Sequence, residues 1–118
     1  MSRAKGIDRP ELAKKSWENL SGFFRKYPNI LKVIDYVKKN SLEDKLHART
    51  SLQRLIISPR HRYDAKVHVL RIGEEGSISE IEMFDTDSNL IEKDNFAATE
   101  LVKKIKSKLL FIVEEYEL

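Results

Sequence analysis

The chain has 118 residues, 41% of them hydrophobic and 35% charged, and it contains no cysteine, which excludes disulfides and thiolate metal sites. This composition fits one small domain with its own core and excludes a fully disordered chain. The net charge of +3 is the sum of two unequal parts: Lys and Arg outnumber Asp and Glu by 17 to 7 over residues 1–72, whereas acidic residues lead by 12 to 5 over residues 73–118.

We expect neither a secretory signal nor a membrane-spanning segment. No apolar run approaches the roughly 20 residues needed to cross a bilayer, and the first ten residues, MSRAKGIDRP, lack the apolar region of a secretory signal. We therefore expect a soluble intracellular protein, cytoplasmic or nuclear, without membrane contact.

Two helices are predicted at the start of a single domain that spans residues 8–118, after a basic mobile tail over residues 1–7. Asp8 followed by Pro10 and Glu11 is typical of a helix start, and apolar residues at spacings of three and four continue to Tyr27. A second amphipathic helix is predicted from Pro28 to Lys39, packed against the first.

The next segment allows two interpretations. We favour a short third helix from Ser41 to about Ala48 and then a strand from Ser51 to Ser58, because Leu52 to Ile57 is a short apolar run. A single long helix over the same residues is the alternative, and Pro59 ends either one.

A β-hairpin is predicted next, with strands over residues 65–72 and 77–83 and a turn at Gly73–Gly76. A four-residue loop would set Val67 opposite Glu82. A five-residue loop sets Val67 opposite Ile81 and puts Lys66 and His68 on the face of Glu80 and Glu82, so burial favours the second register or a bulge.

The C-terminal part is predicted to contain a turn at Asp85–Asn89, a short strand at Leu90–Glu92 and a long helix that begins at Asp94 or Asn95. One apolar stripe follows this last helix: Ala98, Leu101, Val102, Ile105, Leu109, Ile112, Val113 and Tyr116. The predicted fold is α+β, with an antiparallel meander of three or four strands and the last helix packed on one sheet face.

The densest basic cluster predicts a nucleic-acid-binding surface. Arginine binds phosphate in a two-point fashion, and a tyrosine ring can stack on a base. We expect a small non-enzymatic accessory or regulatory protein that binds DNA or RNA, with no cofactor, metal ligand or catalytic residue assigned. The predicted contact residues are Arg54, Arg60, His61, Arg62, Tyr63, Lys66 and Arg71.

Two alternatives remain open. The first is a protein-interaction adaptor or inhibitor, or a homodimer, that uses an apolar helical face and complementary charge; Leu110 and Phe111 lie off the main stripe of the last helix, and Phe24 lies on the first helix. The second is a metal-dependent nuclease, because Asp64-Ala65-Lys66 resembles part of a site that holds a divalent ion beside a scissile phosphate.

Overall fold

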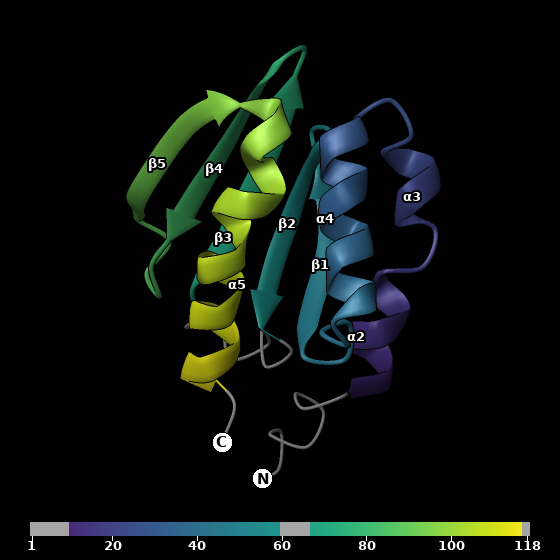
Figure 1. The fold of residues 1–118 in the computed structure, drawn as a ribbon. Coiled ribbons are helices and arrows are strands. Elements are labelled where there is room, and N and C mark those ends of the chain that lie inside the picture. Colours follow the sequence, from purple (N-terminus) through teal and green to yellow (C-terminus); the bar gives the residue numbers. More distant parts are fainter. Residues whose placement is uncertain (1–9, 60–66, 117–118) are drawn as a thin grey trace, which may run out of the picture.

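The computed structural model describes residues 10–59 and 67–116, which form helices and one antiparallel sheet (Figure 1). The expected basic tail at residues 1–7 lies outside this described part. The helices are α2 (Pro10–Ser16), α3 (Leu20–Phe23), α4 (Pro28–Lys39), the short 3-10 helix η2 (Ala98–Glu100) and α5 (Leu101–Tyr116). The strands are β1 (Leu46–Ser51), β2 (Arg54–Pro59), β3 (Val69–Glu75), β4 (Ile78–Phe84) and β5 (Leu90–Ala97).

The sheet is a simple meander, since its strand order β1-β2-β3-β4-β5 is the order of the chain and every pair is antiparallel. The predicted α+β class and the C-terminal helix on the sheet are confirmed. The strand number is five, and the prediction of three or four was wrong because it counted the first hairpin as one strand.

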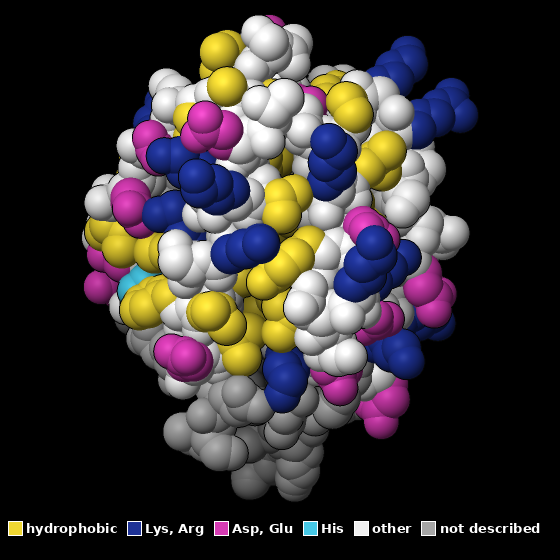
Figure 2. Space-filling view, in the orientation of Figure 1, with side chains coloured by type: hydrophobic (Ala, Val, Ile, Leu, Met, Phe, Trp, Pro, Cys, Tyr) yellow, Lys and Arg dark blue, Asp and Glu magenta, His cyan; other side chains and the backbone are white. Residues whose placement is uncertain are grey.

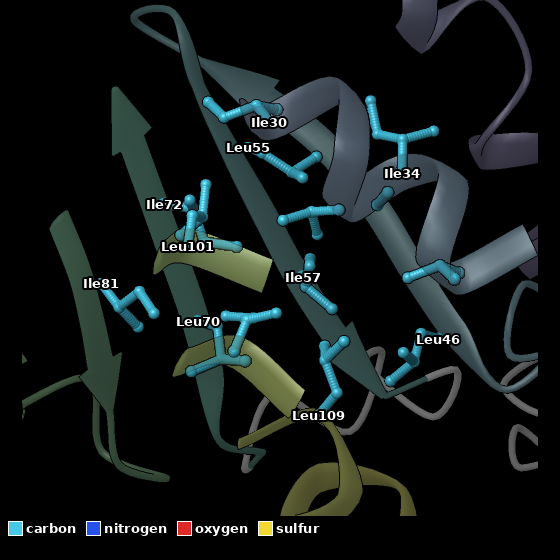
Figure 3. Close-up of a cluster of buried hydrophobic side chains, with 14 of the residues drawn as sticks. Ile30, Ile34, Leu46, Leu55, Ile57, Leu70, Ile72, Ile81, Leu101 and Leu109 are labelled. Atoms are coloured by element: carbon cyan, nitrogen blue, oxygen red, sulfur yellow. The ribbon is translucent and has the colours of Figure 1, made fainter. Parts of the chain in front are cut away.

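Helices α4 and α5 lie side by side on one face of the sheet, which we call the inner face (Figure 1). Alternate residues of β2, β3 and β4 point from this face into the core (Figure 3). They meet Ile30 and Ile34 of α4 and Leu101 and Leu109 of α5. The other side chains of the strands point to the opposite, outer face, on which no described helix packs.

The expected first helix is interrupted after Ser16. Asn19 adopts a left-handed conformation with φ of 69°, which separates α2 from α3. The indole N–H of Trp17 donates to the carbonyl oxygen of Leu46 at 2.9 Å, and the Ser16 hydroxyl accepts from the backbone N–H of Ala48 at 2.9 Å. These contacts dock α2 on β1 and satisfy part of the edge of that strand.

Leu46 to Pro59 forms a hairpin, so the expected short helix and the single long helix were wrong, whereas the expected strand is confirmed from Arg54 onward. The chain turns at residues 40–45 and enters β1, where a helix was expected. Ser51 pairs with Arg54, which leaves Leu52 and Gln53 as a two-residue turn. Both have positive φ, 51° and 64°, as a type I′ turn requires. The sequence lacks the Asn-Gly signature of this turn.

The second hairpin also turns later than predicted. Glu75 pairs with Ile78 around Gly76 and Ser77, and Gly76 has a φ of 63°, which suits glycine. Ile72 therefore lies opposite Ile81, and Arg71 opposite Glu82. Both proposed registers were wrong because Glu74, counted as part of the turn, belongs to the strand.

His68 was wrongly placed on the face of Glu80 and Glu82. Its ring contacts Phe111 of α5 edge-to-face, with 5.3 Å between ring centroids.

The strand after the Asp85–Asn89 turn was also expected to be short, yet β5 continues to Ala97 and the final helix begins after it. The predicted apolar stripe of this helix is buried from Leu101 to Val113, apart from the half-buried Val102.

Glu74 caps α4 from across the fold. Its buried carboxylate accepts the backbone N–H groups of Asn29 at 3.1 Å and Ile30 at 3.0 Å, and the side-chain amide of Asn29 at 3.0 Å. Tyr27, which precedes the helix, provides no side-chain cap. The carboxylate thus replaces the missing local cap and places a negative charge at the positive end of the helix.

Candidate binding surface on the outer sheet face

The outer face carries a band of charged side chains across its centre. The ladder places Arg71 of β3 beside Ile56 of β2 and opposite Glu82 of β4, which in turn faces Lys93 of β5. Arg54, Gly73, Glu80 and Asn95 form the next row, since Gly73 pairs with Glu80 and Glu80 with Asn95. Arg54 of β2 and Arg71 of β3 are thus brought close to Glu80 and Glu82 of β4, which pairs with β3.

These charges form a connected network. Oε1 of Glu82 accepts from Nε of Arg71 at 2.7 Å and from Nη1 of Arg54 at 3.3 Å. Glu80 lies 3.6 Å from Nη1 of Arg54 through one oxygen and 3.1 Å from Nζ of Lys93 through the other. Three cations and two carboxylates leave this network with a formal charge of about +1, so the two arginines are largely neutralised by residues of the same chain.

Glu82 is the centre of the network. Its side chain is only 6% exposed. The hydrogen bond from Arg71 outweighs the effect of burial and holds the pKa of Glu82 below its ordinary value of 4.5. The guanidinium of Arg71 also lies 5.0 Å from the ring centroid of Phe84. Glu82 therefore stays ionised at neutral pH and fixes the orientation of both arginines.

A hollow of about 840 Å³ opens beside this network, at the end of the sheet where the β1–β2 and β3–β4 turns lie. Its lining is mixed: Arg54, Glu80 and Asn95 contribute polar groups, and Leu52 and Ile78 contribute apolar ones. Leu52 is 91% exposed and Ile78 52% exposed. The hollow has the size of a ligand or peptide pocket, but it is open to solvent.

Leu52 is held in an unfavourable backbone conformation. A positive φ at a bulky residue other than glycine costs about 1–2 kcal/mol. The turn is supported by the phenol of Tyr27, which donates to the side-chain oxygen of Gln53 at 2.9 Å. A nearly fully exposed leucine contributes little to folding, so folding alone gives no reason for leucine at this strained position.

The structure brings together two of the seven predicted contact residues, Arg54 and Arg71. The other five, Arg60, His61, Arg62, Tyr63 and Lys66, lie outside the described residues, as does Asp64 of the nuclease hypothesis. Within the described ranges, no group of three or more His, Asp or Glu side chains has the arrangement of a metal site. The nuclease hypothesis thus gains no support from residues 10–59 and 67–116.

Two acidic residues of this surface were not predicted to belong to it. Glu80 and Glu82 were placed on the face of Lys66 and His68, whereas they pair with Arg54 and Arg71. Because they alternate along one strand, the sequence correctly predicted that both lie on the same face. The predicted hairpin register was wrong, however, so Arg54 and Arg71 were not identified as their partners. Leu52 was assigned to a strand interior, because nothing in its sequence context indicates a tight turn.

The helix side presents a second surface. Figure 2 shows apolar side chains gathered over α4 and α5, with Lys and Arg on both sides of them. Leu110 and Phe111 of α5 are exposed, as the alternative hypothesis expected, but Phe24 is fully buried and belongs to the core. In the described part of the chain, no helix combines the length and apolar character needed to span a bilayer.

No protein family model, curated protein or solved structure matches this chain.

Proposed function

We propose that the protein is a non-enzymatic interaction protein that docks a partner polypeptide at the hollow beside its β1–β2 and β3–β4 turns. This proposal keeps the adaptor hypothesis but assigns the contact to the β1–β2 and β3–β4 turns instead of the helical face. The observation that carries it is Leu52, an exposed apolar side chain on a strained turn beside a second exposed apolar residue, Ile78. Strain that does not serve the fold commonly serves a binding site.

The chemistry of the hollow favours polypeptide over phosphate. Its apolar rim suits an aliphatic or aromatic anchor of the partner, and the amides of Gln53 and Asn95 suit a peptide backbone. Arg54, one of the cations predicted to hold phosphate, is engaged by Glu80 and Glu82. A phosphate would have to compete with these two carboxylates.

The proposal is tested by photo-cross-linking in cells that express the protein naturally. A benzophenone amino acid at position 52 is compared with the same group at Glu18, an exposed residue near α2. We expect a discrete, nuclease-resistant adduct at position 52 alone, and we expect Ile78→Asp in the same chain to abolish it. Equal adducts at both positions, or an adduct that persists in Ile78→Asp, would contradict docking at the hollow.

Nucleic-acid binding on the outer sheet face is the second candidate function. The observation in its favour is that Arg54 and Arg71 lie side by side, each with a side chain 38% exposed. A guanidinium has five N–H donors, more than one carboxylate oxygen can use. The segment of residues 60–66, with its further arginines, connects the two strands that carry them.

The second candidate is tested by fluorescence anisotropy with labelled single- and double-stranded DNA and RNA. Counterion release predicts affinity that falls steeply, by about tenfold or more, between about 50 and 200 mM salt. Arg54→Ala/Arg71→Ala and Arg60→Ala/Arg62→Ala should each weaken binding. Unchanged binding in both double variants would remove this surface from consideration.

A further inference from the structure

The two edges of the sheet are treated differently by the fold. β1 is covered by α2 and the residue that follows it, since Ser16 and Trp17 bond to the backbone of β1. β5 has eight residues, contains no proline, and pairs with β4 alone among the described strands. Most of its residues are exposed. A long edge strand of this kind offers backbone groups to any strand that lies beside it.

The ladder shows which groups of β5 point outward. The N–H of Ala98 donates to the carbonyl oxygen of Ser77 at 2.8 Å, in register with the pairing of Ala97 and Ile78. Bonded and non-bonded pairs alternate along an antiparallel ladder. Phe96, Asp94 and Glu92 therefore bond to β4, whereas Lys93, Asn95 and Ala97 direct their N–H and C=O groups to the open edge.

The charges that normally protect an edge strand are all engaged within the chain. Lys93 pairs with Glu80 at 3.1 Å, Glu92 with Lys108 at 2.9 Å and Asp94 with Lys104 at 4.0 Å. These partners lie on β4 and α5, on the side of β5 away from the open edge. The ion pairs reduce the repulsion that these side chains would exert on an approaching strand.

We propose that β5 pairs with β5 of a second copy of this chain, in an antiparallel arrangement around a two-fold axis at Asn95. The axis is perpendicular to the sheet, so inner side chains meet inner ones and outer side chains meet outer ones. Lys93 then lies opposite the partner's Ala97, and Asp94 opposite the partner's Phe96. All three outward-facing residues take part.

Charge disfavours the two registers that are shifted toward the start of β5. If the axis lay at Asp94, this carboxylate would face its own copy. If the axis lay at Lys93, the two lysines would face each other, and Glu92 would lie opposite the partner's Asp94. Like charges directly opposite one another destabilise a ladder. The register centred on Asn95 contains no such pair. It also places the partner's Asp94 beside Phe96, whose ring lies 5.6 Å from the ammonium group of Lys104.

The first test is the mass in solution. We expect sedimentation equilibrium to give a reversible dimer at micromolar concentration and above, with twice the monomer mass of 13.8 kDa. Asn95→Pro removes an outward N–H that the β4 ladder does not use, and because the axis doubles the loss, it should weaken association about tenfold or more. Asn95→Ala keeps the N–H and should associate nearly as the wild type does.

A second measurement avoids dependence on the proline variant. Amide hydrogen exchange of the wild type is followed residue by residue at high and low protein concentration. The N–H groups of Lys93 and Asn95 should exchange slowly only at high concentration, whereas those of Asp94 and Phe96 should be protected at both. A protein that stays monomeric throughout, or exchange at Asn95 that is independent of concentration, would overturn the proposal.

Discussion

Removing the carboxylate of Glu74 should destabilise the protein by about 3 kcal/mol. In Glu74→Ala the backbone N–H groups of Asn29 and Ile30 lose their acceptor at the buried start of α4. An unsatisfied buried donor costs about 1–3 kcal/mol, and the lost charge at the helix terminus adds about 0.3–1 kcal/mol. Water can reach part of this helix end, which keeps the total near the lower end of the range for two donors.

The expected change in melting temperature follows from the size of the chain. An unfolding entropy near 0.25 kcal/mol per kelvin for 118 residues converts the loss into a fall of about 12 °C. Glu74→Gln keeps an acceptor oxygen but no charge, so its fall should be about half as large. Circular dichroism during heating, together with urea denaturation, measures both.

The neighbouring Glu75 is the matched control, because it is exposed on the same strand. Glu75→Ala should change the free energy of unfolding by less than about 0.5 kcal/mol. If Glu74→Ala proved no more destabilising than Glu75→Ala, the carboxylate would not be the cap of α4, and the energetic argument for this contact would be wrong.

Three further predictions concern other contacts. Leu52→Asn should raise the free energy of unfolding by about 1 kcal/mol, because asparagine tolerates a positive φ. The same substitution should abolish the partner contact that depends on position 52. A loss of stability in urea denaturation would refute the strain argument. Glu82→Gln should make the free energy of unfolding less sensitive to acid. The pKa of Glu82 in the folded protein lies below its ordinary value of 4.5, so the stabilisation from the ionised carboxylate is present above pH 4.5 and is lost as the pH falls toward the folded pKa. Equal acid sensitivity of variant and wild type in pH-dependent unfolding would contradict this. Trp17→Phe should cost about 2 kcal/mol, since the carbonyl of Leu46 loses its buried indole donor, and thermal melting that matches the wild type would show that this bond is dispensable.

The sequence predicts elements well where one periodicity continues without interruption. A period of four residues predicted α4 and most of α5. The residues that carry this period, Ile30, Ile34, Leu101, Ile105 and Leu109, are buried as expected. Trp17, Leu20 and Phe24 keep helical spacing across a break, so periodicity alone gave no indication of the left-handed residue at Asn19.

The candidate surface was less predictable because it depends on turns that local chemistry does not mark. A type I′ turn built from Leu52 and Gln53 contradicts turn preferences and is stabilised by a distant residue, Tyr27. A shift in the next turn moved Glu74 into a strand and set Arg71 against Glu82. Charge composition identified the basic and acidic parts correctly, but only the register shows that they neutralise one another.

The agreement between strand order and chain order has a consequence for how the molecule forms. Each of the four strand pairings joins consecutive strands, so each can close by itself as a hairpin or short loop without waiting for distant parts of the chain. Contacts of low sequence separation give fast folding. The contact between α4 and α5 joins segments more than 60 residues apart, and the Glu74 cap also connects distant residues. We therefore expect the sheet to assemble early and the placement of α4 to limit the folding rate.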